Sequence, residues 1–162
     1  MSEARQQAFI DAPVELVWEL VSDVDRHPEW WPRVLEVECE GLEPGCTYRQ
    51  VVQTPMGKDK MTLRVDALED CRDLRIRCVK TGTFVHWTLT AAQDGTFVDA
   101  TFGMEPFTLQ YRAFDLTIGR RFFRTWLRES LHAMQQVAAK REEAKSEEYL
   151  QEAKTEQVQD AG

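Results

Sequence analysis

The 162-residue sequence has no long apolar run, and it lacks the short motifs that identify most nucleotide-binding and hydrolytic enzymes. No stretch approaches the roughly 20 consecutive apolar residues that a transmembrane helix requires. The N-terminal residues MSEARQQAFIDAP contain no hydrophobic signal core, which predicts a cytoplasmic protein. Because G-x-S-x-G, H-E-x-x-H, P-loop and G-x-G-x-x-G motifs are all missing, triad hydrolases, zinc proteases and nucleotide-binding enzymes have no support.

Excess positive charge and paired cysteines are missing as well. The net charge is -8, and residues 142–162, with seven acids and two lysines, hold -5 of it, which leaves -3 for the rest. A mildly acidic body argues against a nucleic-acid binder, which would depend on phosphate contacts. The four cysteines contain no C-x-x-C pair; they are Cys39, Cys46, Cys71 and Cys78. Buried thiols in a reducing compartment are therefore favoured over a zinc site, and neither metal nor cofactor is expected.

The N-terminal part predicts a strand followed by two helical segments. Residues 4–10 predict the strand, and Ala12-Pro13 opens a helix because proline is tolerated in a first helical turn. The next feature is HPEWWPR, residues 27–33, with two adjacent tryptophans between two prolines. The prolines fix its entry and exit, so it predicts no more than one turn of helix. One tryptophan is predicted to fill the core beneath the long helix described below, and the other to lie nearer the rim of a pocket.

From Val34 onward, apolar and polar residues alternate with the two-residue period of β-strands. The pattern predicts six strands, at residues 35–39, 47–53, 60–68, 73–79, 83–90 and 96–104. The turns between them are short and contain glycine, proline or aspartate, so the strands form an antiparallel meander; parallel neighbours would need long crossovers. The strand 47–53 fits least well, because an inward Tyr48 and Val52 would bring Gln50 inward with them.

One face of the predicted sheet is apolar and the other is polar. The predicted inner face consists of Leu35, Val37, Cys39, Met61, Leu63, Val65, Leu74, Ile76, Cys78, Val85, Trp87, Leu89, Val98, Ala100, Phe102 and Met104. A long helix should cover it, with one apolar stripe formed by Leu116, Gly119, Phe123, Trp126, Leu127, Ser130, Met134, Val137 and Ala138. Tyr111, Phe114 and Ile118 point away from that stripe, so the helix either kinks near Gly119 or is buried on more than one face. Residues 1–141 then form one domain, and 142–162 a charged tail that is a fraying helix or disordered.

Two segments of the chain resemble a known superfamily. In residues 10–34, IDAPVELVWELVSDVDRHPEWWPRV, an A-P dipeptide is followed by V-W-x-x-V-S-D and H-P-x-W-W-P. This order resembles the opening of the START-like or SRPBCC superfamily, which includes polyketide cyclase/dehydrase, lipid transport and pollen-allergen-like proteins. Residues 104–139, with their G-R-R-F element, are similar to the last strand and helix of these families. The resemblance covers residues 4–141 and implies an α+β helix-grip fold of order β-α-α-β6-α, in which a seven-stranded antiparallel sheet wraps the C-terminal helix around a pocket.

A pocket of this kind would be walled by large apolar side chains with a few polar groups. The candidate ligand-contacting residues are Trp31, Tyr48, Gln50, Met61, Leu63, Ile76, Trp87, Phe102, Met104, Phe114, Phe123 and Trp126. Periodicity predicts the same side chains for a closed core, so it does not separate the two possibilities. Of the two adjacent tryptophans, Trp31 is the one predicted to contact ligand.

Candidates for catalysis do not form a recognisable set. Tyr48, Gln50 and Tyr111 carry polar groups that suit a ligand oxygen, a partly buried Glu105 would be a base of raised pKa, and His27 lies beside the tryptophans near the expected pocket mouth. The first four are equally explained as strand-end or rim residues, and for His27 a solvent-exposed turn residue before a proline is favoured.

Three functions agree with these patterns. The first is binding of a hydrophobic small molecule such as a lipid or polyketide, and the second is a polyketide cyclase or dehydratase that folds and orients a polyketone chain. The third is a protein-interaction module that uses the acidic tail and a basic patch. The basic patch comprises Arg120, Arg121, Arg124 and Arg128. The same patch also fits a solvated helix face whose charge is matched by Glu129. The ligand, any turnover and the oligomeric state are left open by the sequence.

Overall fold

Seven strands form one antiparallel sheet in the order β1-β7-β6-β5-β4-β3-β2 in a computed structural model that describes residues 2–162. The strands are β1 (Ser2–Ile10), β2 (Val34–Glu38), β3 (Thr47–Thr54), β4 (Gly57–Glu69), β5 (Asp73–Cys78), β6 (Thr83–Ala92) and β7 (Gly95–Met104). The helical elements are α1 (Val14–Ser22), η1 (Val24–Arg26), α2 (His27–Trp30), α3 (Leu109–Phe114), the π-helical η2 (Asp115–Gly119) and α4 (Arg120–Asp160). The predicted helix-grip fold is confirmed.

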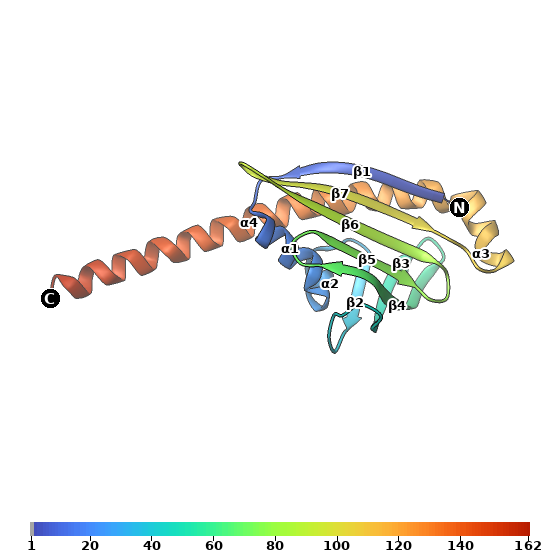
Figure 1. Cartoon of the computed structure of the whole chain (residues 1–162), viewed down its shortest axis with the longest axis horizontal. Coiled ribbons are helices and arrows are strands. Elements are labelled where there is room, and N and C mark those ends of the chain that lie inside the picture. The colour runs from blue at the N-terminus through green and yellow to red at the C-terminus, as the bar shows by residue number, and fades with distance from the viewer. Residues whose placement is uncertain (1) are drawn as a thin grey trace.

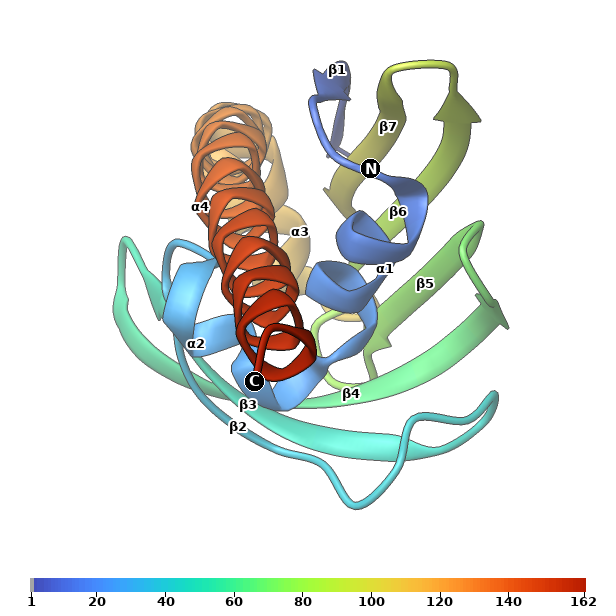
Figure 2. The same cartoon turned by 90° about the vertical axis from the view of Figure 1, so that its left-hand side faces the viewer.

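The sheet curves around the C-terminal helix, as Figure 2 shows in a view along α4. Strands β2 to β7 follow one another as a meander, and β1 joins the far edge by pairing with β7. Helix α4 packs on the inner face against β1 and β7, while α1 and α2 fill the space beside it. One face of the sheet is therefore covered and the other meets solvent, as the alternation of the sequence predicts.

The inner face agrees with the prediction except at the start of β2. The β2–β3 register shifts between Val34 and Glu36, which marks a β-bulge. Val34 is therefore buried, and Leu35 is 40% exposed and points outward, contrary to the prediction. A shift of one residue moves a side chain to the opposite face of a sheet, and single-sequence periodicity does not reveal where it occurs. In β3, Tyr48, Gln50 and Val52 do all point inward.

The helical segment after β7 is interrupted near Gly119, which matches the first of the two predicted alternatives. Asp115 is buried in η2; its Oδ1 atom accepts a hydrogen bond from the Ser2 backbone N–H at 3.1 Å, and its carbonyl oxygen accepts one from Ser2 Oγ at 3.1 Å. A Cβ atom at position 119 would lie 2.8 Å from Asp115 Oδ1, so glycine makes room for this carboxylate. The π turn adds a residue to the helical repeat. Leu116 consequently points into solvent, 85% exposed, and its predicted place on the buried stripe is wrong.

Helix α4 continues beyond the body of the protein (Figure 1). Ala138 is its last buried residue, and the helix runs on to Asp160 with nearly all side chains exposed. Two ion pairs join the base of this extension to the N-terminal helices: Arg141 Nη2 lies 3.7 Å from Glu29 Oε2, and Lys145 Nζ lies 3.8 Å from Glu19 Oε2. The proposed boundary between residues 1–141 and 142–162 stays a prediction. Across residues 2–162, the helices are all too short or too polar to span a membrane.

Candidate functional site

A cavity of about 510 Å³ lies between one end of the sheet and the helical segment that follows β7. The sheet contributes the β3–β4 hairpin and the adjoining ends of β6 and β7, and the roof is formed by α3, η2 and the first turns of α4 (Figure 1). Its walls are mostly aliphatic and aromatic, with a few polar groups. The lining comprises Val52, Thr54, Met56, Gly57, Lys58, Asp59, Met61, Thr81, Thr83, Met104, Gln110, Tyr111, Ala113, Phe114, Thr117, Ile118, Phe122, Phe123 and Trp126.

A tight turn before β6 supplies two hydroxyl groups to the cavity. Thr81 Oγ1 donates a hydrogen bond to Thr83 Oγ1 at 2.9 Å, and both side chains are buried. Gly82 between them has a φ of 76°, and its carbonyl oxygen accepts a hydrogen bond from the Glu105 N–H at 2.8 Å. A Cβ atom at position 82 would overlap the Glu105 carbonyl, so only glycine lets this turn approach the end of β7.

The two adjacent tryptophans lie behind the cavity wall. Trp31 is 2% exposed, and its indole stacks on Trp126 with ring centroids 5.5 Å apart. Its Nε1–H donates to Ser130 Oγ at 2.8 Å, and Trp126 Nε1–H donates to the Pro32 carbonyl at 2.8 Å. Trp126 lines the cavity and Trp31 does not, contrary to the prediction, because Trp31 is enclosed by other aromatic rings. The HPEWWPR segment therefore supports the cavity wall.

Arg33, the last residue of the HPEWWPR segment, supports a second aromatic side chain of the wall. Arg33 has a φ of 72°, which is unusual for a residue other than glycine, and its guanidinium lies 5.4 Å from the centroid of the Phe122 ring. Arg33 Nη2 also pairs with Glu129 Oε2 at 3.3 Å. Its carbonyl accepts a hydrogen bond from the Gln53 N–H of β3 at 2.7 Å. Arg33 thus joins β3 to the helix that carries Phe122.

The cavity includes some of the predicted ligand-contacting residues and excludes others. Five of them line it: Met61, Met104, Phe114, Phe123 and Trp126. The others do not line it, and all are buried in the rest of the core; they are Trp31, Tyr48, Gln50, Leu63, Ile76, Trp87 and Phe102. The reason is that the cavity occupies one end of the inner face, whereas alternation identifies the whole face.

Sequence reasoning also missed several lining residues. They come from the β3–β4 hairpin, the Thr81–Thr83 turn, α3, η2 and the first turn of α4, and include Met56, Lys58, Gln110, Thr117 and Phe122. No periodic pattern identifies turn residues as pocket-lining, because the pairing of distant turns is set by tertiary structure. The strand register places Gln50 next to two lining residues. Gln50 is paired with Met61, which lines the cavity, and it lies two residues from Val52, which also lines the cavity.

Two buried polar groups on the inward face of β3 lack partners. Tyr48 Oη and Gln50 Oε1 are buried and form no hydrogen bond with any residue that the structure describes. Burial raises the pKa of the Tyr48 hydroxyl well above its ordinary value, so the group is a neutral donor. Buried polar atoms without partners are rare in proteins, and they mark places where a ligand or water can supply the missing bond.

The other three catalytic candidates are dispersed. Tyr111 lines the cavity from α3. Glu105 lies outside the cavity and pairs with two arginines of the outer sheet face: Arg77 Nη1 at 2.7 Å and Arg75 Nη2 at 3.5 Å. These ion pairs indicate a structural position for Glu105, and it does not face a substrate in this cavity. No group of three or more histidine, cysteine, aspartate or glutamate side chains within residues 2–162 is placed to hold a metal ion.

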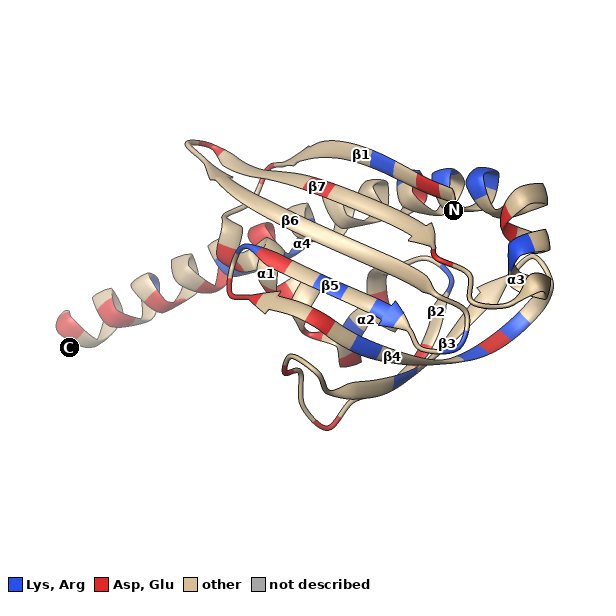
Figure 3. Cartoon of the chain, turned by 45° about the vertical axis from the view of Figure 1, so that its right-hand side comes forward, with Lys and Arg blue, Asp and Glu red and all other residues tan. Residues whose placement is uncertain are grey.

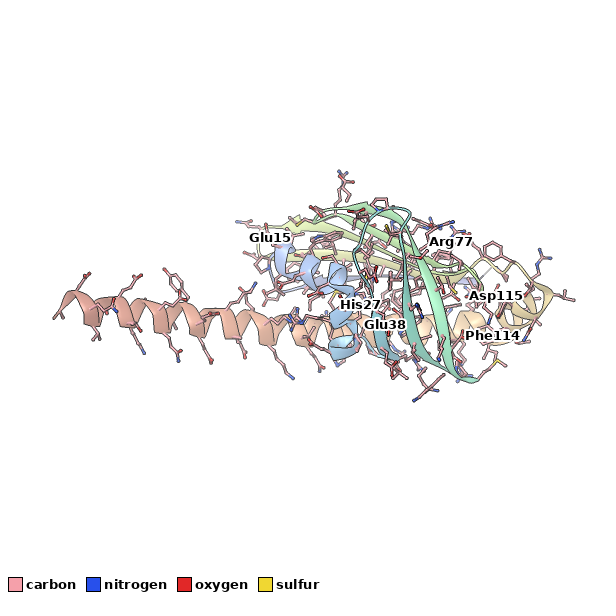
Figure 4. The ribbon with its side chains drawn as sticks, turned by 90° about the horizontal axis from the view of Figure 1, so that it is seen from below. Glu15, His27, Glu38, Arg77, Phe114 and Asp115 are labelled. Atoms are coloured by element: carbon pink, nitrogen blue, oxygen red, sulfur yellow. The ribbon has the colours of Figure 1, made fainter. Side chains whose placement is uncertain are left out.

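His27 is fully buried, and it lies neither at the pocket mouth nor in solvent. It is the first residue of α2, and Figure 4 shows it well away from Phe114 and Asp115 at the end of the body where the cavity lies. Its Nε2–H donates to the Val21 carbonyl at 2.9 Å, and its ring meets Trp30 and Trp31 edge-on. Burial lowers the pKa of His27 to about 4, so the imidazole is neutral at physiological pH. This histidine packs the aromatic cluster and cannot exchange protons with a ligand in the cavity.

The sequence and the fold both have counterparts among known proteins. The family model described as polyketide cyclase/dehydrase and lipid transport matches residues 1–139. The chain belongs to this polyketide cyclase/dehydrase and lipid transport family. No curated protein shows significant similarity to it.

Solved structures share the fold of this family member at low sequence identity. A START superfamily protein from Mycobacterium smegmatis is 11% identical with a TM-score of 0.71, and the match covers 86% of this chain and 99% of that one. XoxI from Bacillus cereus is 17% identical with a TM-score of 0.64, covering 88% and 99% of the two chains. The di-domain ARO/CYC protein StfQ of the steffimycin biosynthetic pathway is 18% identical with a TM-score of 0.66, covering 86% of this chain and 51% of StfQ. These likenesses show the START-like helix-grip fold.

Proposed function

We propose that the protein binds a hydrophobic small molecule, such as a lipid or polyketide, in the cavity between the sheet and the C-terminal helical segment. The observation that carries this proposal is a cavity of about 510 Å³ walled by Met61, Met104, Phe123 and Trp126. Small-molecule sites commonly have volumes of about 300–1,000 Å³ and mostly apolar walls with a few polar groups. Membership of a family that includes lipid transport supports the same function.

Binding would work by removing apolar surface of the ligand from water. Each Å² of buried apolar surface contributes about 25 cal/mol, so affinity comes mainly from the aromatic and methionine walls. The Thr81 and Thr83 hydroxyls at the sheet end and the Tyr111 side chain in the roof would help to set the orientation of the ligand. The other polar lining residues are Thr54, Lys58, Asp59, Gln110 and Thr117. A lipid or polyketide that carries a few oxygen atoms on a hydrocarbon chain fits this lining.

Filling the cavity mouth should block binding without damage to the fold. Ala113 on α3 lines the cavity but is itself exposed, so Ala113→Trp places an indole at the mouth with little strain on the core. We expect the variant to bind an apolar anilinonaphthalene fluorophore about tenfold more weakly or worse, while its thermal midpoint stays close to that of the unmodified protein. Fluorescence titration measures affinity, and native mass spectrometry of the purified protein tests for a copurified ligand.

The matched control is Ala139→Trp, which adds the same side chain to an exposed alanine of α4 outside the cavity. It should bind the fluorophore like the unmodified protein. If both tryptophan variants bind with unchanged affinity, the cavity is not the binding site.

A second function, polyketide cyclisation, is favoured by the polar groups in and next to the cavity. Tyr111 lines the cavity, and Tyr48 and Gln50 carry unpaired buried polar atoms on the inward face of β3, where Gln50 is paired with the lining residue Met61. In a cyclase these groups would hydrogen-bond ketone oxygens while the walls hold the chain in a reactive conformer, so that orientation supplies much of the rate. The fold of StfQ, an ARO/CYC protein, is consistent with this function.

Cyclase activity predicts that Tyr48→Phe, Gln50→Leu and Tyr111→Phe change which rings form from a poly-β-ketone substrate. Chromatography of the products, with a polyketide synthase supplying the chain, measures the distribution, and circular dichroism confirms folding. Tyr149→Phe is the control, because Tyr149 is an exposed tyrosine in the projecting part of α4. An unchanged product distribution in the triple variant would exclude these three groups as orienting contacts and leave ligand binding as the function.

A further inference from the structure

Large apolar side chains are exposed in a group around the cavity. We call this group the apolar rim; it comprises Met56, Phe107, Leu109, Leu116 and Ile118, with exposed fractions of 76%, 59%, 83%, 85% and 39%. Met56 lies in the β3–β4 turn, and the other four belong to the stretch that runs from the loop after β7 through α3 and η2. Met56 and Ile118 also line the cavity, so the rim is continuous with its interior. Grouped apolar side chains on a protein surface usually mark an interaction site.

Leu109 and Leu116 are left exposed because other apolar side chains of the same helical segment cover the cavity. Tyr111 and Phe114 line the cavity, whereas Leu109 and Leu116 do not line it and are exposed. The π-helical turn, held by the buried Asp115 and by Gly119, fixes this division. Rotating the segment to bury the leucines would expose the cavity wall, so only a partner outside the fold could cover them.

Basic side chains accompany the rim. Residues 106–124 contain four arginines and one acid, Asp115, for a net charge of +3 in a chain of net charge -8; the arginines are Arg112, Arg120, Arg121 and Arg124. Among the residues described, none of these four arginines forms an ion pair. Figure 3 shows the resulting polarity: blue bands near α3 and the start of α4, and red bands along the projecting tail at the far end of the molecule. The tail, residues 142–162, has a net charge of -5.

We propose that the apolar rim and its arginines dock on the surface of a bilayer that contains anionic lipids. A bilayer accepts apolar side chains without a complementary shape, and its headgroups supply negative charge at the level of the arginines. A second copy related by two-fold symmetry would instead bring two positively charged segments together. The acidic tail lies at the opposite end and would be repelled by the surface, which orients the cavity toward the membrane. A hydrophobic ligand would then pass between bilayer and cavity with little exposure to water, although the docking itself does not depend on ligand binding.

Vesicle flotation tests this proposal with the full chain. We expect the protein to float with vesicles of phosphatidylcholine and phosphatidylserine, to bind vesicles of phosphatidylcholine alone about tenfold more weakly or worse, and to be released by high salt. The double variant Leu109→Ser/Leu116→Ser and the double variant Arg120→Glu/Arg121→Glu should each weaken flotation about tenfold or more. Neither leucine lines the cavity, so the leucine variant should keep its affinity for the apolar fluorophore, and loss of docking is thereby distinguished from loss of ligand binding.

The control for apolar exposure is Leu150→Ser/Val158→Ser, which removes two exposed apolar side chains from the projecting part of α4. This variant should float like the unmodified protein. The proposal is overturned if the protein does not bind anionic vesicles, if it binds neutral vesicles equally well, or if the rim variant floats as well as the control. Light scattering that shows a dimer which dissociates in the rim variant, without vesicle binding, would instead identify a second copy as the partner.

Discussion

Trp31→Ala should lower the free energy of unfolding by about 3–5 kcal/mol, the range measured when large buried aromatic side chains are truncated. Trp31 is 2% exposed and contacts aromatic rings from three parts of the fold: Trp126 of α4, Phe102 of β7 and Trp87 of β6. Alanine would leave a void at the point where the helix meets the sheet. It would also leave Ser130 Oγ without the Nε1–H donor that now lies 2.8 Å away.

Urea unfolding followed by circular dichroism measures the decrease in the free energy of unfolding caused by Trp31→Ala. Trp31→Phe separates its two parts, because phenylalanine keeps an aromatic ring in the cluster but cannot donate to Ser130, so we expect an intermediate loss. Phe97→Ala is the matched control: Phe97 is also aromatic, but it is 54% exposed on the outer face and packs on Phe9. We expect Phe97→Ala to lower the free energy of unfolding by less than about 1 kcal/mol. If Trp31→Ala costs no more than Phe97→Ala, the tryptophan does not hold the helix against the sheet.

The sequence predicts the architecture well because each strand has to bury one face. Alternation over β4 to β7 identifies the inward residues correctly, since only one register buries Leu63, Ile76, Trp87 and Phe102 together. The errors occur where the backbone departs from regular geometry. Leu35 lies at a β-bulge, and Leu116 lies in a π-helical turn. Each irregularity changes the phase of the pattern by one residue, and a hydrophobicity pattern carries no separate signal for it.

The candidate site is less predictable than the fold, because a cavity is an unfilled part of the core. Trp31 and Trp126 are both buried tryptophans in apolar patterns, and only their packing shows that Trp126 separates Trp31 from the cavity. The same limit applies to Tyr48 and Gln50. The sequence predicts that both point inward, but whether a polar side chain meets a partner or an open space depends on strands and helices far apart in the chain.

His27 shows that burial can change the chemical role that the sequence suggests for a residue. From sequence, a histidine before a proline is either a solvent-exposed turn residue or a proton donor near a pocket. In the structure it is enclosed by Trp30 and Trp31, and its Nε2–H satisfies the Val21 carbonyl in the last turn of α1. Its Nδ1 atom is buried without a partner among the described residues. The ring is therefore held in its neutral form, and protonation of it would lower the stability of the folded protein.

Acidification from pH 7 to pH 4 should destabilise the protein by about 3 kcal/mol through His27 alone. Burial lowers the pKa of His27 from 6.5 to about 4 in the folded protein, and the unfolded chain keeps the ordinary value. Between these two values the unfolded state binds more protons than the folded state, so stability falls as the pH falls. The contribution is fully present above pH 6.5 and is lost progressively toward pH 4.

The variant His27→Gln isolates this effect, because glutamine can donate an N–H to the Val21 carbonyl but does not titrate. Urea unfolding at a series of pH values should show a steeper loss of stability in the unmodified protein than in the variant, with the two curves converging as the pH falls toward 4. Carboxylate groups titrate in both proteins and cancel in the comparison. His132→Gln is the control, since it makes the same substitution at an exposed position of α4, so an effect seen only in His27→Gln belongs to the buried site. Parallel curves for the unmodified protein and His27→Gln would mean that His27 accepts a proton in the folded state as readily as in the unfolded one, contrary to its enclosure between the tryptophans.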